Sequence, residues 1–174
     1  MGIPDVYSGE IVKLGDDINT DLIFPGKYIL VLDPPEMRKH LLEGLGEEYH
    51  SRIKPGDIIV AGRNFGCGSS REQAASAIRA AGVPVVVAKS FARIFYRNAI
   101  NAGLLVLTCP EAAEAAADRE PITVDLKGGR IELPGGRAFR FPALPDFLME
   151  IIEAGGLVAH GRKVVAARRA RPEA

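Results

Sequence analysis

The sequence predicts a single α/β domain that carries additional antiparallel strands, and three observations support this class. The chain has 174 residues, of which 47% are hydrophobic and 25% charged, the size and balance of one soluble globular domain. Its middle alternates β-branched runs with helical patterns, as parallel β-α-β units do. Its last third contains a hairpin pattern. We expect the domain to span residues 1–160, followed by a basic, frayed tail over residues 161–174.

The first third mixes short apolar runs with turn-forming residues. Residues 9–14 alternate between apolar and polar side chains and predict a strand, which is followed by the polar loop 15–21. The apolar runs 22–24 and 28–32 both end at a turn that contains proline. Residues 36–45 predict a helix, because apolar side chains recur on one face and glycines stand at its end.

The middle of the chain supplies the alternating units. A turn at residues 54–57 leads into a buried strand at residues 58–60. The elements predicted after it are a helix at 73–81, a strand at 83–88, a helix at 90–102 capped by Ser90 and ended by Gly103, a strand at 104–108 and a short helix at 111–117.

The last third changes to antiparallel character. Residues 122–126 and 131–133 flank a glycine pair and predict a hairpin. A further strand is predicted at residues 138–141, and a closing helix at residues 145–153. No repeat or linker divides the chain, which supports one domain.

Composition excludes several function classes. The 22 basic and 22 acidic residues balance, so the chain lacks the strongly basic field of a dedicated nucleic-acid binder. No apolar run is long enough to span a bilayer, and the start shows no signal-peptide pattern, so we expect no membrane partner and a cytoplasmic location. Two cysteines, Cys67 and Cys109, cannot supply the three or four thiolates that usually hold an iron–sulfur cluster.

The segment richest in chemistry is residues 62–73, a glycine-rich turn between a predicted strand and a predicted helix. Such a turn directs backbone N–H groups and the positive helix end at an anion. Ser69 and Ser70 each have a capping partner three residues later, and because one cap suffices, the other hydroxyl is free. Arg71 adds a planar fork suited to a carboxylate or phosphate. An ordinary glycine-rich turn before a doubly capped helix is the alternative.

Common nucleotide and hydrolase motifs do not fit this segment. A P-loop requires lysine after the last glycine, where Ser69 stands, and a dinucleotide fingerprint requires a third glycine, where Arg71 stands. A hydrolase nucleophile elbow is absent as well. The three histidines, His40, His50 and His160, lack metal-ligand spacing, so we expect no metal site in this chain.

Residues 62–73, together with the string Ala88–Ile94 and Asn98, closely resemble the swivelling C-terminal domain of the aconitase superfamily. More narrowly, the chain resembles the small subunits of 3-isopropylmalate dehydratase and their homoaconitase-like relatives. Further matching strings are Gly15–Asp21 with Pro25 and Tyr28, Lys54–Asp57 and Glu150–Leu157. The resemblance extends from about Gly9 to Leu157, nearly the whole chain.

This resemblance implies a three-layer β/β/α fold with a mixed sheet. It also implies a hydro-lyase that is active only with a separate large subunit, on which the [4Fe–4S] cluster lies, so that no cofactor is bound by this chain. The implied substrate is a small dicarboxylic hydroxy acid, which is isomerised by removal and return of water. The low cysteine count agrees with a cluster on the partner.

Site residues are carried over from the resemblance position by position. Ser69 is similar to the catalytic serine, which acts as an alkoxide base, and Ser70 and Arg71 match contacts to a substrate carboxylate. Thr20 and Asp21 match a Thr-Asp pair of the substrate-binding cleft. A helix cap for Ser69 and a capped turn for Thr20 and Asp21 are the alternatives.

Substrate specificity is expected in the segment Tyr28, Ile29, Leu30 and Val31, which the resemblance identifies as the specificity loop. Homoaconitase-like relatives carry an arginine where Leu30 stands, and an apolar segment offers nothing to pair with a third carboxylate. The segment therefore favours an isopropyl or other alkyl group, although Lys27 lies nearby in sequence. Gln73 is a departure, because the family usually has histidine there.

The sequence thus predicts the small subunit of an isopropylmalate isomerase of leucine biosynthesis. A homoaconitase-type subunit, or a subunit of another alkylmalate or maleate-type dehydratase, is the alternative within the superfamily. A stand-alone anion-binding module is the alternative from another class.

Overall fold

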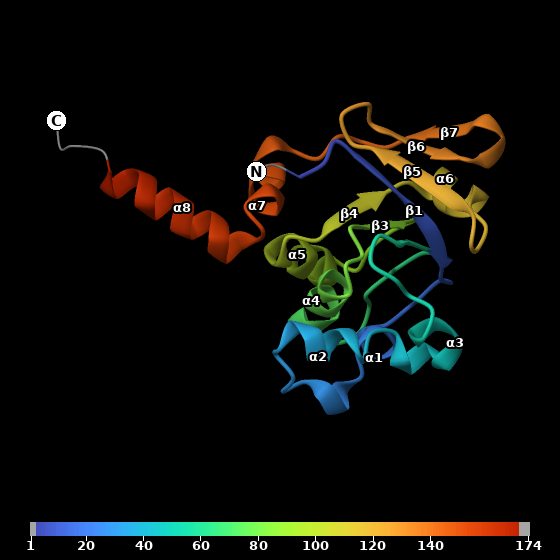
Figure 1. Ribbon diagram of the computed structural model, residues 1–174, viewed down its shortest axis with the longest axis horizontal. Coiled ribbons are helices and arrows are strands. Elements are labelled where there is room, and N and C mark those ends of the chain that lie inside the picture. Colours follow the sequence, from blue (N-terminus) through green and yellow to red (C-terminus); the bar gives the residue numbers. More distant parts are fainter. Residues whose placement is uncertain (1–2, 171–174) are drawn as a thin grey trace.

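The protein is described here by a computed structural model that covers residues 3–170. Its seven strands form one sheet in the order β4-β3-β2-β1-β5-β6-β7 (Figure 1). The strands are β1 (Val6–Lys13), β2 (Ile58–Ala61), β3 (Val85–Ala88), β4 (Leu105–Thr108), β5 (Pro121–Asp125), β6 (Arg130–Leu133) and β7 (Arg137–Arg140).

Strand β1 joins two differently built halves of this sheet. Its residues 6–10 pair antiparallel with β5, whereas its residues 11–13 pair parallel with β2. The parallel half continues through β3 and β4, and the antiparallel half through β6 and β7. Figure 1 shows the antiparallel strands above the parallel ones and the helices α4 and α5 beneath. This is the expected three-layer β/β/α arrangement with a mixed sheet.

Burial follows the same division. Every residue of β2 and β3 is buried, because helices cover one face of the parallel strands and the second layer covers the other. Buried positions alternate with more exposed ones along β5 and β6. That alternation is typical of antiparallel strands with one face in the core.

Eight helices lie within the described residues. They are α1 (Thr20–Ile23), α2 (Pro34–Arg38), α3 (Glu47–His50), α4 (Glu72–Ala80), α5 (Arg93–Ala102), α6 (Pro110–Ala115), α7 (Asp146–Glu153) and α8 (Leu157–Arg169), with 3-10 turns η1 (Gly26–Tyr28), η2 (Glu43–Leu45) and η3 (Pro134–Gly136). Small buried residues such as Ala74, Ala77 and Ala99 bring α4 and α5 close together and against the parallel strands.

The single helix expected over residues 36–45 is wrong, since α2 ends at Arg38. Leu42 adopts the left-handed conformation with φ 59°, and its N–H donates to the carbonyl of Ile23 at 2.8 Å. Leu41 and Leu42 are both fully buried. A helix would direct the Leu42 N–H to the carbonyl four residues earlier, so the bond to Ile23 takes the chain off the helical path.

The expected capping of the helix at residues 90–102 is also wrong at its start. Helix α5 begins at Arg93 after Ala92, which provides no side-chain cap. The Ser90 hydroxyl instead accepts a hydrogen bond from the N–H of Asn64 at 2.9 Å, and so joins two loops. Gly103 ends the helix with φ 75°, as expected.

The basic segment after residue 160 continues α8 through Arg169, where a frayed tail was expected. Alanine, arginine and lysine have high helix propensity, which favours this helix. It projects from the body and is exposed from Arg162 onward (Figure 1). Residues 1–2 and 171–174, including Arg171 of the basic segment, lie outside the described residues. Over residues 3–170, every helix is too short or too polar to cross a bilayer.

Candidate active site

Two loops singled out by the sequence lie side by side in the structure. Because β1 and β2 are parallel neighbours, their carboxyl ends meet at one edge, and so do the loops that follow them. Main-chain hydrogen bonds join residues 15–21 to the serine loop, which we define as residues 62–71. They run from Gly66 N–H to Ile18 O at 2.7 Å, from Asp17 N–H to Arg63 O at 2.8 Å and from Thr20 N–H to Cys67 O at 2.9 Å.

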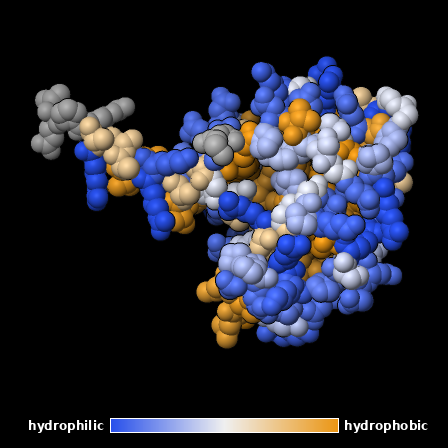
Figure 2. Space-filling model, in the orientation of Figure 1, coloured by the Kyte–Doolittle hydropathy of each residue, from blue (hydrophilic) through white to orange (hydrophobic). Residues whose placement is uncertain are grey.

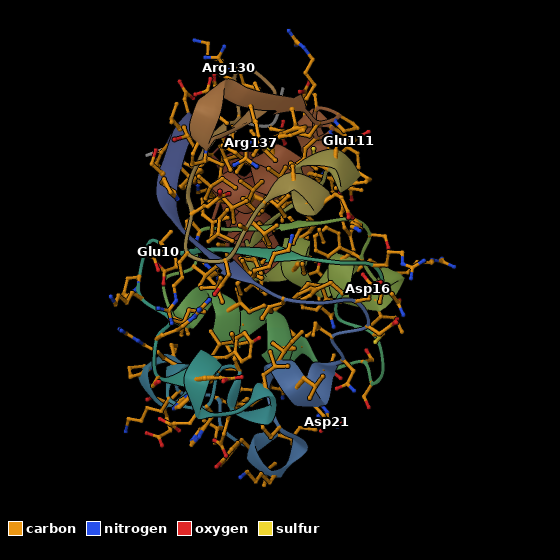
Figure 3. The ribbon with its side chains drawn as sticks, turned by 90° about the vertical axis from the view of Figure 1, so that its right-hand side faces the viewer. Glu10, Asp16, Asp21, Glu111, Arg130 and Arg137 are labelled. Atoms are coloured by element: carbon orange, nitrogen blue, oxygen red, sulfur yellow. The ribbon has the colours of Figure 1, made fainter. Side chains whose placement is uncertain are left out.

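Charged side chains strengthen the same junction. Arg63 Nη2 lies 3.0 Å from Asp16 Oδ2, and Asn64 Nδ2 donates to Asp17 Oδ1 at 2.8 Å. The backbone N–H of Arg63, followed by its guanidinium, lowers the pKa of the Asp16 carboxyl below its ordinary value. Figure 3 shows Asp16 and Asp21, near the two ends of the first loop, along one side of the molecule.

Glycine is required at Gly66 in the serine loop. Its φ is 79°, and a Cβ there would lie 2.1 Å from Cγ of Phe95. The buried Phe65 beside it packs edge-on against the rings of Phe91 and Phe95. The loop thus passes directly over an aromatic cluster of α5, which fixes its path.

Ser69 and Ser70 are exposed at the end of this loop, ahead of α4. The capping role considered for them is wrong, because α4 begins at Glu72 and has Arg71 as its N-cap without a side-chain bond. Within residues 3–170, neither serine hydroxyl has a hydrogen-bond partner. Both hydroxyls are therefore available to a ligand.

Arg71 is held in place by groups 45 to 50 residues earlier in the chain. Its Nη1 and Nη2 donate to the Asp21 carboxylate, the latter at 3.1 Å, and Nη1 also reaches the Phe24 carbonyl at 3.4 Å. The side chain is only 15% exposed. Of the five N–H donors of a guanidinium, these bonds use three, so two are left for a substrate carboxylate.

Asp21 is occupied by protein groups. Besides Arg71, it accepts the N–H of Gly26 at 3.1 Å, and the Arg71 bond is the main reason that the Asp21 pKa is lowered. A Cβ on Gly26 would lie 3.0 Å from the Arg71 guanidinium, so this glycine admits the arginine. The sequence identified Gly26 only as the end of an apolar run.

Thr20 lies beneath the serine loop. It is 2% exposed, and its Oγ1 would lie 3.5 Å from a Cβ placed on Gly68. The helix that carries it, α1, is capped by Asn19, whose side chain accepts the N–H of Leu22 at 3.0 Å. Asn19 is absent from the caps predicted from the sequence, although asparagine is among the residues preferred at a helix N-cap.

A second set of contacts holds the specificity segment, residues 28–31. The Tyr28 hydroxyl donates to Glu43 at 3.0 Å, and its ring stacks on His40 with centroids 3.6 Å apart. Lys27 Nζ pairs with the same Glu43 at 2.6 Å, so the charge of Lys27 is already matched. That bond is the largest cause of the fall in the Glu43 pKa to about 2. Glu43 carries no local sequence signal, because two of its partners, Lys27 and Tyr28, lie 16 and 15 residues earlier in the chain.

The aliphatic side chains of this segment point outward except that of Val31, which is half-buried and packs against the core. Leu30 is 90% exposed, and Ile29 and the following Leu32 are also exposed. Figure 2 shows hydrophobic atoms projecting from the lower left of the body, where Figure 1 places the chain between α1 and α2. One side-chain bond joins the segment to α4, from Gln73 Nε2 to the Ile29 carbonyl at 3.0 Å.

Two hollows flank the start of α4. One, of about 510 Å³, is lined by the serine loop and by Arg93 and Arg97, which have no ion-pair partner within residues 3–170. The other, of about 640 Å³, is lined by α2, α4, the end of α5 and the first residues of α8, with Glu72 and Gln73 on its wall. Residues 69–71 lie in the chain between Gly68, which lines the first hollow, and Glu72, which lines the second.

An iron–sulfur cluster does not fit the donor groups of this chain. Cys109 is buried and directs its Sγ to the Arg140 carbonyl, whereas Cys67 lies in the serine loop beside Asp17. In the part of the chain that the structure describes, no three His, Cys, Asp or Glu side chains are placed to hold a metal.

Comparison with known proteins identifies the family. The Aconitase C-terminal domain family matches residues 36–112. A Methanopyrus kandleri protein named 3-isopropylmalate dehydratase small subunit 1 is 51% identical over 155 residues, covering 88% of this chain and 91% of its own. A Methanothermobacter thermautotrophicus protein named methanogen homoaconitase small subunit is 45% identical over 161 residues, covering 92% and 93%.

A solved structure gives the same result. The crystal structure of a 3-isopropylmalate dehydratase from Methanocaldococcus jannaschii matches with a TM-score of 0.87 and 41% identity, covering 94% of this chain and 99% of that chain. The resemblance drawn from the sequence, and the fold that it implied, are confirmed. The chain belongs to the family of 3-isopropylmalate dehydratase small subunits, which carry the aconitase C-terminal domain fold.

Proposed function

We propose that this chain is the small subunit of a hydro-lyase that interconverts 2-isopropylmalate and 3-isopropylmalate in leucine biosynthesis, in the cytoplasm and together with a large subunit. One observation carries the proposal. Two exposed serine hydroxyls, neither with a hydrogen-bond partner among residues 3–170, stand beside an arginine that Asp21 holds in a fixed position. The names of the relatives support the same activity.

The substrate is a dicarboxylate, and Arg71 and Ser70 bind one of its carboxylates. Removing a proton from the carbon next to a carboxylate moves negative charge onto that carboxylate, so donors placed there stabilise the transition state. Arg71 has two N–H groups left for this purpose, and the Ser70 hydroxyl is free. Asp21 orients the guanidinium and does not itself touch the substrate, while Thr20 supports the serine loop from below.

Ser69 is the base in this proposal. Its Oγ, as an alkoxide, takes the proton from the substrate carbon, a double bond forms, and hydroxide leaves the neighbouring carbon. Isomerisation follows when hydroxide adds to the carbon that lost the proton and Ser69 returns its proton to the carbon that lost the hydroxyl. A serine hydroxyl is a very weak acid, so the anion needs stabilisation by the N-terminus of α4 and by Arg71. An iron–sulfur cluster would supply Lewis-acid chemistry, and we assign it to the large subunit because the cysteines here do not fit one.

The specificity segment favours an alkyl substituent over a third carboxylate. Leu30 offers an exposed apolar surface, and Lys27 is neutralised by Glu43, so neither residue presents a free positive charge. This geometry favours isopropylmalate over homocitrate. The alternative, a homoaconitase-type subunit, is supported by the name of the Methanothermobacter thermautotrophicus relative, which is 45% identical.

The test is anaerobic turnover by the chain co-expressed with its large subunit, with 2-isopropylmalate, 3-isopropylmalate and homocitrate in parallel. Isomerisation of isopropylmalate without use of homocitrate supports the proposal. Preference for homocitrate overturns the specificity argument and keeps the serine chemistry. Failure of a cluster-loaded complex on all three substrates points to another alkylmalate or maleate-type substrate. Tight dicarboxylate binding by the chain alone, with no turnover in the complex, would indicate an anion-binding module.

A further inference from the structure

We propose that Gln73 is a positioning residue that sets the specificity segment at a fixed place relative to Arg71. The inference rests on the proposed function, because it concerns which substituent the enzyme accepts. Gln73 would thereby have a role at a position where the resemblance implies histidine.

The geometry is direct. Gln73 lies in the first turn of α4, two residues after Arg71, and its Nε2 donates to the Ile29 carbonyl at 3.0 Å. Within the described residues, this is the only hydrogen bond from outside the local turn to residues 29–32. The others stay within a few residues, such as Val31 N–H to Tyr28 O at 2.8 Å.

The segment depends on this bond because its side chains give it little packing. Its start is anchored where Tyr28 contacts Glu43 and His40. Beyond that point Ile29, Leu30 and Leu32 are exposed, and before Met37, which is buried in α2, only the half-buried Val31 packs against the core. An exposed stretch with few contacts outside itself has low local stability. The Gln73 bond holds it at its middle, directly before Leu30.

The start of α4 therefore fixes two parts of the substrate at once. Arg71 receives the carboxylate, and Gln73 holds the backbone that presents Leu30 to the substituent. Residues in the same helical start have little freedom relative to each other, so the distance between carboxylate site and apolar surface is set. Loss of the bond should leave the carboxylate chemistry in place and loosen discrimination among alkyl groups.

Two substitutions remove the bond in different ways. Gln73→Glu keeps the length of the side chain and replaces the N–H donor by a carboxylate, whereas Gln73→Asn keeps the amide and shortens the reach by one methylene. Glu72→Gln is the matched control: it changes charge in the same turn, at an exposed residue with no hydrogen bond to the specificity segment. Glu72 is exposed and Gln73 is half-buried, so each of the three variants should fold.

The first measurement is hydrogen–deuterium exchange of the full chain without its partner. We expect exchange in residues 28–32 to rise about three- to tenfold in both Gln73 variants, the effect of losing one net hydrogen bond, and to stay unchanged in Glu72→Gln. Unchanged exchange in both Gln73 variants would overturn the inference, whatever the substrate of the enzyme proves to be.

The second measurement uses the complex with the large subunit and compares kcat/KM for malates with isopropyl, ethyl and methyl substituents. We expect the preference for isopropyl to shrink about three- to tenfold in both Gln73 variants, through KM and with kcat nearly unchanged. A fall in kcat with selectivity intact would contradict a positioning role. If the wild-type complex does not use isopropylmalate, the proposed function fails, and the exchange result still decides whether Gln73 holds the segment.

Discussion

The serine loop and the specificity segment adjoin the same start of α4, yet they are held by different kinds of contact. Main-chain hydrogen bonds to residues 15–21 and a glycine packed on Phe95 fix the serine loop. The specificity segment is held by side chains, those of Glu43, His40 and Gln73. Main-chain bonds survive most substitutions, whereas side-chain bonds change with each one. Substitutions in the specificity segment can therefore change which substrate is accepted without moving the residues of the serine loop.

The largest expected effect comes from Ser69→Ala, which removes the proposed base from the part held by main-chain bonds. We expect kcat to fall by at least about 10²-fold, the loss of a positioned acid–base group. Folding and partner binding should be unchanged, because the hydroxyl has no partner within the described residues. Steady-state kinetics of the complex, with circular dichroism as the control for folding, measures this. Near-normal turnover would refute the assignment of Ser69.

Asp21→Asn tests whether an ion pair between the two loops orients Arg71. We expect kcat/KM to fall about ten- to a hundredfold, because a charged hydrogen bond to the guanidinium is weakened. The matched control is Asp16→Asn, which weakens the exposed pair with Arg63 in the same loop and should change kcat/KM less than about twofold. Equal effects of both variants would assign the loss to the loop as a whole.

Leu30→Arg should change the substrate without changing the reaction. A guanidinium at this exposed position can pair with a third carboxylate, so we expect the ratio of kcat/KM for homocitrate over isopropylmalate to rise about tenfold. Leu30→Met is the control of similar size without charge, and it should leave the ratio unchanged. Unaltered selectivity in Leu30→Arg would remove this residue from the specificity argument.

Glu43→Gln tests the same substrate preference through the charge of Lys27. Without the negative charge, Lys27 loses its ionic partner and the Tyr28 hydroxyl keeps only a neutral amide acceptor, so homocitrate should gain about two- to fivefold relative to isopropylmalate. Glu48→Gln, which removes an exposed carboxylate of α3, is the control and should have no effect on the ratio. An equal ratio in both variants would mean that Lys27 lies out of reach of the substrate.

The smallest effect concerns stability in acid. The bonds from Lys27 to Glu43 and from Arg52 to Asp118 lower both carboxyl pKa values to about 2, from 4.5 and 3.8. The unfolded chain therefore binds these protons more readily, so both groups stabilise the fold above about pH 4.5, and this contribution disappears as the pH falls towards 2. Urea unfolding at several pH values should show a smaller acid loss in Glu43→Gln than in the wild type.

Much of the parallel half could be predicted from the sequence, because its strands are continuous buried runs with helices between them. The errors occur where distant contacts override local pattern. Leu42 is not part of the helix expected over residues 36–45, because its N–H donates to the carbonyl of Ile23 and its side chain lies in the core. Ser90 does not cap helix α5, because its hydroxyl accepts a hydrogen bond from the N–H of Asn64.

The site shows the same limit. The strings Ser69-Ser70-Arg71 and Thr20-Asp21 could be proposed as site residues from the sequence, through the resemblance that they carry. The use of Asp21 to hold Arg71 and of Glu43 to neutralise Lys27 could not, since each joins positions that only the folded chain brings together.

The division of β1 between the two halves of the sheet has a consequence for how the chain folds as it is made. This strand leaves the ribosome before the other strands, yet residues 6–10 find their partner only when β5, more than a hundred residues later, has been synthesised. Contacts of such sequence separation form late, and an unpaired strand exposes N–H and C=O groups to other chains. Chains truncated before residue 121 should therefore aggregate through β1, whereas complete chains should not.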